Sequence, residues 1–234
     1  MPPKSSPHAP PAARHTHSSS LACKISLLSQ ATGSCEITMN DTTVIAAVHG
    51  PLAPSMDDRE YSDEGKLFVS LKFAPGTNPS IPTSQSTSSR MTTSEQLLAS
   101  SVRSTLLTSI LLSNIKKSVM SVHIEVLQDE GLVFDAAVTC ASLALADAGV
   151  EMIDVVSCCT VSFHAGSTMV MDPNKAESKG EEGRVTIALM ANTNKVNMYS
   201  QNGSLSMTDL KTASELAKRG CKDLRNIMRK VLLS

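Results

Sequence analysis

The stretch "SVMSVHIEVLQDEGLVFDAAVTCASLALADAG", residues 118–149, combines a strand, a turn and a helix in one run of sequence. The pattern of residues 118–128 predicts a strand. Residues 135–149 have mostly small side chains and end in glycine, which is typical of a helix closed by a glycine cap. Between them, Val133 and Phe134 are expected to join the hydrophobic core. We expect this strand and helix to form the centre of the fold.

Short strands precede this stretch. The predicted strands are 23–30, 34–39, 42–51 and 66–73. Their spacing predicts an antiparallel meander. Between Pro75 and Ser94, 11 of 20 residues are serine or threonine and three are proline, and such a composition cannot bury enough apolar surface to stay ordered. We therefore expect a disordered loop at about 75–94.

Further elements surround the central helix. They are predicted as a helix over 94–117, two strands within 153–172 hinged at Ala165-Gly166, a hairpin over 184–204 and a helix over 206–233. The first of these helices carries an apolar stripe that includes Leu98, Val102 and Leu106, and Ser94 is expected to cap it. Strands and helices in this succession predict an α+β domain.

Length and composition limit the classes of function. A chain of 234 residues fits one domain with extended tails, predicted here as a domain over 21–234 after a disordered tail over 1–20. A mitochondrial presequence is the alternative for the tail, but its five prolines disfavour the helix that a presequence needs. The net charge is −1 and aromatic residues make up 3%. This composition argues against a protein that binds nucleic acid through its own field and by stacking.

Cysteines and apolar runs exclude other classes. No pair of the six cysteines has the two-residue spacing of a zinc knuckle or a redox motif. We therefore expect reduced thiols, no metal site and no cofactor. No run of 18 apolar residues is present, so no membrane association is expected.

The last predicted helix has a basic face. Its cations are Lys218, Arg219, Lys222, Arg225, Arg229 and Lys230. These side chains complement the helix dipole near its C-terminus and are expected to be solvated, with RNA contact as the alternative.

The stretch "TMVMDPNKAES", residues 168–178, ends a predicted strand in a polar turn that begins with Asp172. A carboxylate in this place is usually a solvated turn residue. It becomes a candidate acid only if other parts of the chain bring suitable groups beside it.

Three segments together resemble the ribonuclease PH family. They are "LLSQATGSCEITMNDTTVIAAVHGP", "VLQDEGLVFDAAVTCASLALADAGVEM" and "VMDPNKAES". The resemblance runs from about Leu21 to Leu233. It implies a single ribonuclease PH-like domain of the ribosomal protein S5 domain 2-like type, in which mixed sheets pack against helices.

The resemblance also implies where an active site would lie. Active relatives let inorganic phosphate attack the last phosphodiester of RNA, which requires a cationic phosphate cradle and a pair of carboxylates. The cradle sequence Gly-Gly-Thr-Arg-Thr-Ala matches residues 131–136 here, so that Phe134 replaces the arginine and Val133 and Asp135 replace the threonines. This phosphate site is therefore expected to be degenerate.

The carboxylate pair is expected to be incomplete as well. Asp172 matches the first aspartate of the family pattern, and Ser178 occupies the position of the second, with Glu177 adjacent. We expect no intact catalytic pair, with Asp172 and Glu177 as remnant candidates. The candidates for RNA contact are Arg90, Arg103 and Lys175.

The resemblance implies a function in an assembly. The expected role is a non-catalytic subunit of the ring that the RNA exosome builds from ribonuclease PH-like domains, in the nucleus, the nucleolus and the cytoplasm. Expected partners are other ring subunits, cap subunits and RNA that passes through the ring, with homo-oligomers in isolation. The alternative is a self-associating nuclease, either phosphorolytic or with a metal held by Asp172 and Glu177.

Overall fold

The structure, a computed structural model, describes residues 21–53, 65–77, 92–115, 117–164 and 168–233. The strands within these ranges are β1 (Ala22–Ile25), β2 (Gly33–Met39), β3 (Thr42–Leu52), β4 (Lys66–Phe73), β5 (Val119–Gln128), β6 (Val156–His164), β7 (Thr168–Met171), β8 (Gly183–Met190) and β9 (Lys195–Gly203). The helices are α1 (Thr93–Leu107), α2 (Val133–Asp147), α3 (Met207–Leu233) and the short 3-10 helix η2 (Leu112–Asn114). The predicted tail 1–20, the hinge at 165–166 and most of the predicted loop 75–94 lie outside the described residues.

The first sheet has five strands in the order β1-β2-β3-β5-β4. The prediction of a four-strand meander is correct for β1, β2 and β3, which pair antiparallel, and wrong for β4. β5 lies between β3 and β4 and pairs with β4 in parallel. The reason is the connection through α1, because a parallel neighbour requires a crossover segment, usually a helix.

The second sheet has four strands in the order β7-β6-β8-β9, and all its neighbours are antiparallel. Every residue of β6 from Val156 to Phe163 is buried. Both of its faces are covered, because α2 packs on one side and α3 on the other. A polar side chain that reaches β6 is therefore removed from water.

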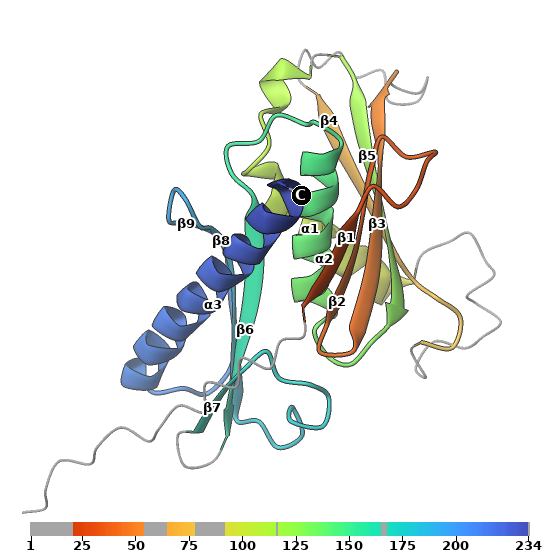
Figure 1. Cartoon of the computed structure of the whole chain (residues 1–234). Helices are drawn as coiled ribbons and strands as arrows, with labels where there is room; N and C mark the ends of the chain where they lie inside the picture. The colour runs from red at the N-terminus through yellow and green to blue at the C-terminus, as the bar shows by residue number, and fades with distance from the viewer. Residues whose placement is uncertain (1–20, 54–64, 78–91, 116, 165–167, 234) are drawn as a thin grey trace, which may run out of the picture.

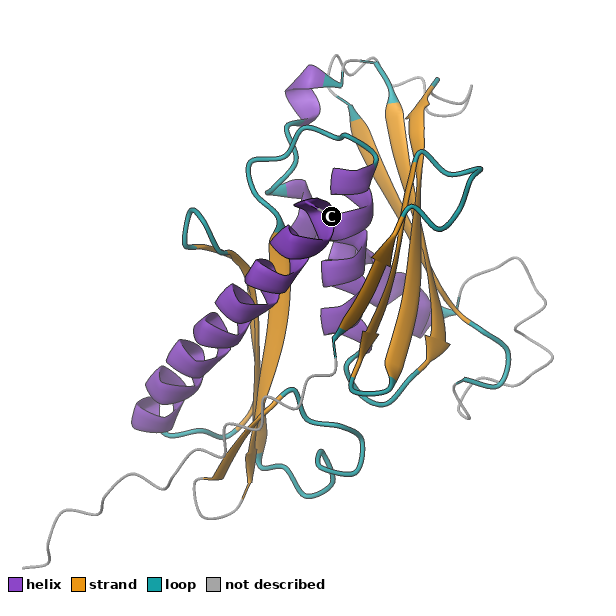
Figure 2. Cartoon of the chain, in the orientation of Figure 1, coloured by secondary structure: helices purple, strands orange, loops and turns teal. Residues whose placement is uncertain are grey.

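The two sheets are separated by helices, as Figures 1 and 2 show. α2 contacts β2 and β3 of the first sheet and β6 of the second, and α1 lies beside it against β4. α3 covers the outer side of the second sheet. One continuous hydrophobic core joins both sheets, which places α2 at the centre of the molecule.

The helix boundaries differ from the sequence prediction at several points. α1 is capped by Thr92 rather than Ser94, through a capping box with Glu95. It ends at Leu107 instead of continuing to residue 117, because Ile110 forms an isolated bridge with Met152. Among the described residues, no helix is long and apolar enough to cross a membrane.

Candidate functional site

The first turn of α2 lies at the centre of the candidate site. The helix begins at Val133, and no side chain caps it at Leu132. Val133 is buried, and Phe134 is half-buried and packs against the core. The carboxyl group of Asp135 is buried as well, with 1% of the residue exposed, and accepts a hydrogen bond from the Cys158 thiol on β6 at 2.9 Å.

Asp172 reaches the same strand from the turn that follows β7. It is the first residue after β7 and has a positive φ of 51°. Its backbone N–H donates to the Thr160 carbonyl at 2.8 Å, and its own carbonyl accepts from the Asn40 side chain at 2.8 Å. The Asp172 carboxyl accepts from the Thr160 N–H at 3.4 Å, and the residue is 5% exposed. These contacts hold its side chain inside the protein.

Two buried carboxyl groups therefore lie against β6. Burial raises the pKa of Asp172 to about 7, and the negative charge of Asp135 acts in the same direction. Burial also raises the pKa of Asp135, against hydrogen bonds from Cys158 and Thr160 and the charge of Arg184. Two buried carboxylates with little compensation cannot both stay charged, so this pair retains a proton near neutral pH.

The raised pKa values of the two carboxyl groups do not by themselves make a catalytic site. A general acid must come within hydrogen-bond distance of the group that it protonates, either directly or through one water. Asp135 and Asp172 are almost fully enclosed, and their carboxyl groups accept hydrogen bonds from Cys158 and Thr160 of β6. In this conformation the pair affects the stability of the core, and its carboxyl groups are too enclosed to contact a substrate.

The turn after Asp172 does not bring Glu177 to the pair. The carboxylate of Glu177 is in an exposed residue and accepts from the Asn174 N–H at 3.0 Å, while Asn174 accepts from the Glu177 N–H at 2.8 Å. At the position of the second family aspartate, the Ser178 hydroxyl accepts from Arg184 at 2.7 Å. The described residues contain no group of three or more metal-binding side chains in suitable positions.

Lys175 belongs to the contact between two loops. Its ammonium group lies 3.2 Å from a carboxylate oxygen of Asp129, and its backbone N–H donates to the Glu130 carbonyl at 2.7 Å. Gly131 allows this approach, because its φ is +112° and a Cβ atom there would lie 3.2 Å from the backbone nitrogen of Lys175. Lys175 therefore holds the turn that follows β7 against the turn that precedes α2, and its role in RNA contact stays a prediction.

The two arginine candidates are placed differently. Arg103 is exposed on α1, and its Nε donates to the Leu67 carbonyl on β4 at 2.7 Å. It thus lies over the first sheet, whereas Asp172 lies at the end of β7 in the second. Arg90 lies outside the described residues. The structure does not join Arg103 to the carboxyl pair.

The sequence prediction missed the partnership of Asp135 with Asp172. It treated Asp135 as a negative charge added to the phosphate cradle and sought the second carboxylate at Glu177. One signal was present, because Asp135 is the single acid between Phe134 and Ala146 in a run that is otherwise apolar or small. A helix buried all round turns such a residue inward.

Comparisons with known proteins match this architecture. Residues 18–151 match the 3′ exoribonuclease family, domain 1, and residues 154–220 match the 3′ exoribonuclease family, domain 2. Together the two matches cover most of the chain. The chain belongs to the 3′ exoribonuclease, or ribonuclease PH, family. The boundary between the two matches falls between α2 and β6, which is also the boundary between the two sheets.

Individual relatives in this family are similar in sequence to this chain over most of their length. The chain is 31% identical to the exosome complex component Rrp41 of Pyrobaculum neutrophilum, over 85% of this chain and 78% of that protein. It is 27% identical to the exosome complex component RRP41 homolog of Arabidopsis thaliana, over 91% of this chain and 86% of that protein. These similarities confirm the family that the sequence motifs indicated.

Solved structures share the fold. The crystal structure of rice Rrp46 superposes with a TM-score of 0.76 at 20% identity, covering 91% of this chain and 94% of that one. A chain of the Archaeoglobus fulgidus exosome with RNA bound to the active site gives a TM-score of 0.73 at 20% identity, covering 88% and 87%. The ribonuclease PH-like α+β fold with mixed sheets and helices is confirmed.

Proposed function

We propose that this ribonuclease PH family member is a non-catalytic ring subunit of an RNA exosome. In this role it supports 3′-to-5′ RNA processing and degradation, including the maturation of ribosomal RNA. The observation that carries the proposal is the first turn of α2, where Phe134 packs against the core and Asp135 is buried against β6. We align Phe134 with the arginine of the family cradle.

The loss of the cradle arginine is large in energetic terms. One unit charge about 5 Å from another contributes roughly 3 kcal/mol at an effective dielectric near 20. Without that attraction, phosphate binds more weakly by about two powers of ten, since each 1.4 kcal/mol is a factor of ten. Val133 adds no hydroxyl in place of the family threonine. A phosphorolytic reaction therefore lacks its attacking group at this site.

Assembly into an exosome is supported by the relatives. The proteins that this chain resembles at 27% and 31% identity over most of their length are named as exosome components. We propose as partners the other ribonuclease PH-like ring subunits and the cap subunits, with RNA held through the assembled ring. The proposed location is the nucleus and the nucleolus, and also the cytoplasm.

The test of catalysis uses the purified chain, a short single-stranded RNA, and reactions with and without phosphate and Mg²⁺. We expect neither nucleoside diphosphates nor monophosphates. Diphosphate release that depends on added phosphate and disappears in Asp172→Asn would overturn the non-catalytic assignment. Monophosphate release that depends on Mg²⁺ and disappears in the same variant would support the alternative of a metal-dependent nuclease.

The test of assembly uses the endogenous protein. Affinity purification is expected to recover several ribonuclease PH-like proteins in comparable amounts, through interfaces of at least about 1,000 Å². Recovery of the chain alone, or as a homo-oligomer with nuclease activity, would contradict the ring proposal. Imaging of the tagged chain tests the proposed location, and its absence from the nucleolus would remove the proposed link to ribosomal RNA.

A further inference from the structure

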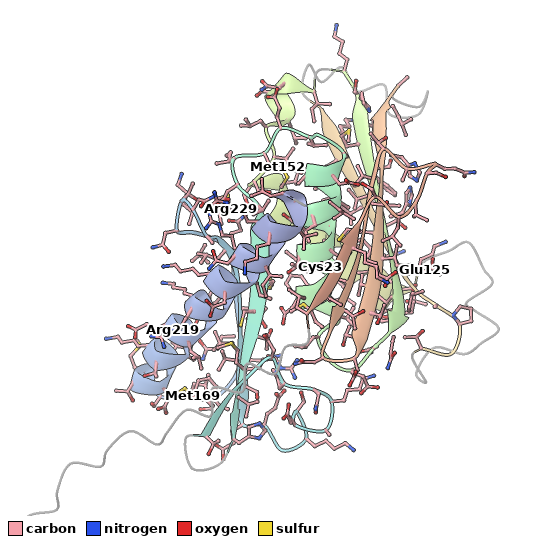
Figure 3. All side chains as sticks on the ribbon, viewed as in Figure 1. Cys23, Glu125, Met152, Met169, Arg219 and Arg229 are labelled. Atoms are coloured by element: carbon pink, nitrogen blue, oxygen red, sulfur yellow. The ribbon has the colours of Figure 1, made fainter. Side chains whose placement is uncertain are left out.

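A groove lies at the C-terminal end of α3, far from the carboxyl pair in the fold. It is a hollow of about 600 Å³ between the last turns of α3, the segment that follows α2, and the turn between β8 and β9. We call it the α3 groove and define it by Met152, Val155, Arg225, Arg229 and Leu233. In Figure 3, Met152 and Arg229 lie at the upper end of α3, and Arg219 lies further down the same helix.

Part of the lining of the α3 groove is apolar. Leu233 is 76% exposed. Leu232, Met152 and Val155 are half-buried and extend the apolar surface of the hollow. Apolar side chains gathered around a hollow favour an occupant that brings aliphatic groups of its own.

The groove also carries positive charge without a matching carboxylate. Arg225 and Arg229 lie one helical turn apart on its rim. The Arg225 guanidinium donates to the side chain of Asn192, which is neutral. Arg229 forms no ion pair within the described part of the chain.

The one acid that lines the hollow is already engaged. Asp154 is 6% exposed and accepts from the Asn192 N–H at 2.7 Å, the Asn192 side chain at 2.8 Å and the Val155 N–H at 2.9 Å. Its oxygens therefore hold the β8–β9 turn and form no ion pair with Arg225 or Arg229. A guanidinium on an apolar rim is well suited to a carboxylate, which it binds through two parallel hydrogen bonds.

We propose that the α3 groove docks an extended segment of a partner protein that carries aliphatic side chains next to a carboxylate. Aliphatic groups would cover Leu233 and Met152, and the carboxylate would pair with Arg229. RNA fits less well, because the described residues of the lining include no aromatic side chain for a base to stack on. The proposal goes beyond the function proposed above and does not require exosome membership.

The test uses the full chain in its native complex. A photo-crosslinking amino acid replaces Leu233, the complex is irradiated in cells, and mass spectrometry identifies the crosslinked segment. We expect a peptide with at least one aspartate or glutamate beside leucine, isoleucine or valine. Arg229→Glu should reduce the crosslink at least tenfold. The matched control is Arg219→Glu, which makes the same charge change on the exposed part of α3 away from the groove and should leave the crosslink within twofold.

Each other result would overturn the docking proposal. A crosslink to RNA, a peptide without carboxylates, no crosslink, or equal losses in Arg229→Glu and Arg219→Glu would each do so. Thermal melts of both variants show whether a loss reflects unfolding, and the loss counts only where the melting temperatures agree. A crosslink to an acidic, aliphatic segment outside the exosome would support the groove and count against the proposed assembly, so the two proposals fail separately.

Discussion

The buried carboxyl pair makes a quantitative prediction for Asp172→Asn. Burial raises the pKa of Asp172 from its ordinary value of 3.8 to about 7. The folded state therefore binds its proton more tightly than the unfolded state, so that stability falls as the pH rises from about 4 to about 7 and is then constant. Each pKa unit corresponds to about 1.4 kcal/mol, so the full cost above pH 7 is on the order of 4 kcal/mol.

Asparagine removes this cost and keeps most of the geometry. Its side-chain oxygen can still accept from the Thr160 N–H, and its amide carries no charge to be buried. We expect Asp172→Asn to gain stability relative to the unchanged chain as the pH rises. Between pH 5 and pH 8 the difference in the free energy of unfolding should grow by about 3 kcal/mol.

Urea unfolding followed by far-UV circular dichroism at several pH values measures this difference, since the chain has no tryptophan for fluorescence. The matched control is Glu177→Gln, which removes an exposed carboxylate from the same turn and reports the effect of net charge alone. A variant whose stability relative to the unchanged chain is independent of pH, or falls as the pH rises, would refute the reasoning. Such a result would mean that the Asp172 carboxyl is ionised and well compensated in the folded protein.

Other predictions concern the turn and the glycines. Gly131→Ala should cost about 1–3 kcal/mol of stability, because alanine is strained at a φ of +112° and its Cβ would lie 3.2 Å from the backbone nitrogen of Lys175. Thermal melts measure the loss, and an unchanged melting temperature would contradict the loop contact. Gly220→Ala should cost about 1–3 kcal/mol, because its Cβ would lie 2.6 Å from the Cys159 sulfur where α3 packs on β6; chemical denaturation tests this, and a stabilised variant would show that the helix can shift freely. Ser178→Asp would restore the second aspartate that the family resemblance predicts, but it should not produce phosphate-dependent release of nucleoside diphosphates, because the Asp172 carboxyl stays buried. Release above the background of the unchanged chain would show that only this aspartate was missing.

Much of the fold was accessible from local pattern. The strand and the small-residue helix of residues 118–149 were predicted and are β5 and α2. The final helix was predicted from Ser206 and begins at Met207. Within this helix, Met228 is fully buried while its neighbour Ile227 is only half-buried. A helix of 27 residues that crosses a twisted sheet does not keep one straight apolar stripe.

The candidate site was only partly predictable. The replacement of the cradle arginine by Phe134 and of the second aspartate by Ser178 is predicted from the resemblance and stays a prediction. The burial of Asp172 was not predicted, since a turn residue after a strand is usually solvated. The contact between Lys175 and Asp129 was also missed, because the two residues belong to separate loops.

The sequence by itself determined the family and the order of strands and helices, and it predicts the loss of the family's phosphate-binding residues. These features depend on residue type and on spacing along a few turns of chain, which is the range over which periodicity acts. Only the tertiary structure decided that β5 separates β3 from β4, and that Asp135 and Asp172 are both buried against β6. Strand neighbours and the charge state of a carboxyl group depend on which distant segments are packed together and how much water they exclude, and these quantities are not defined until the whole chain has folded.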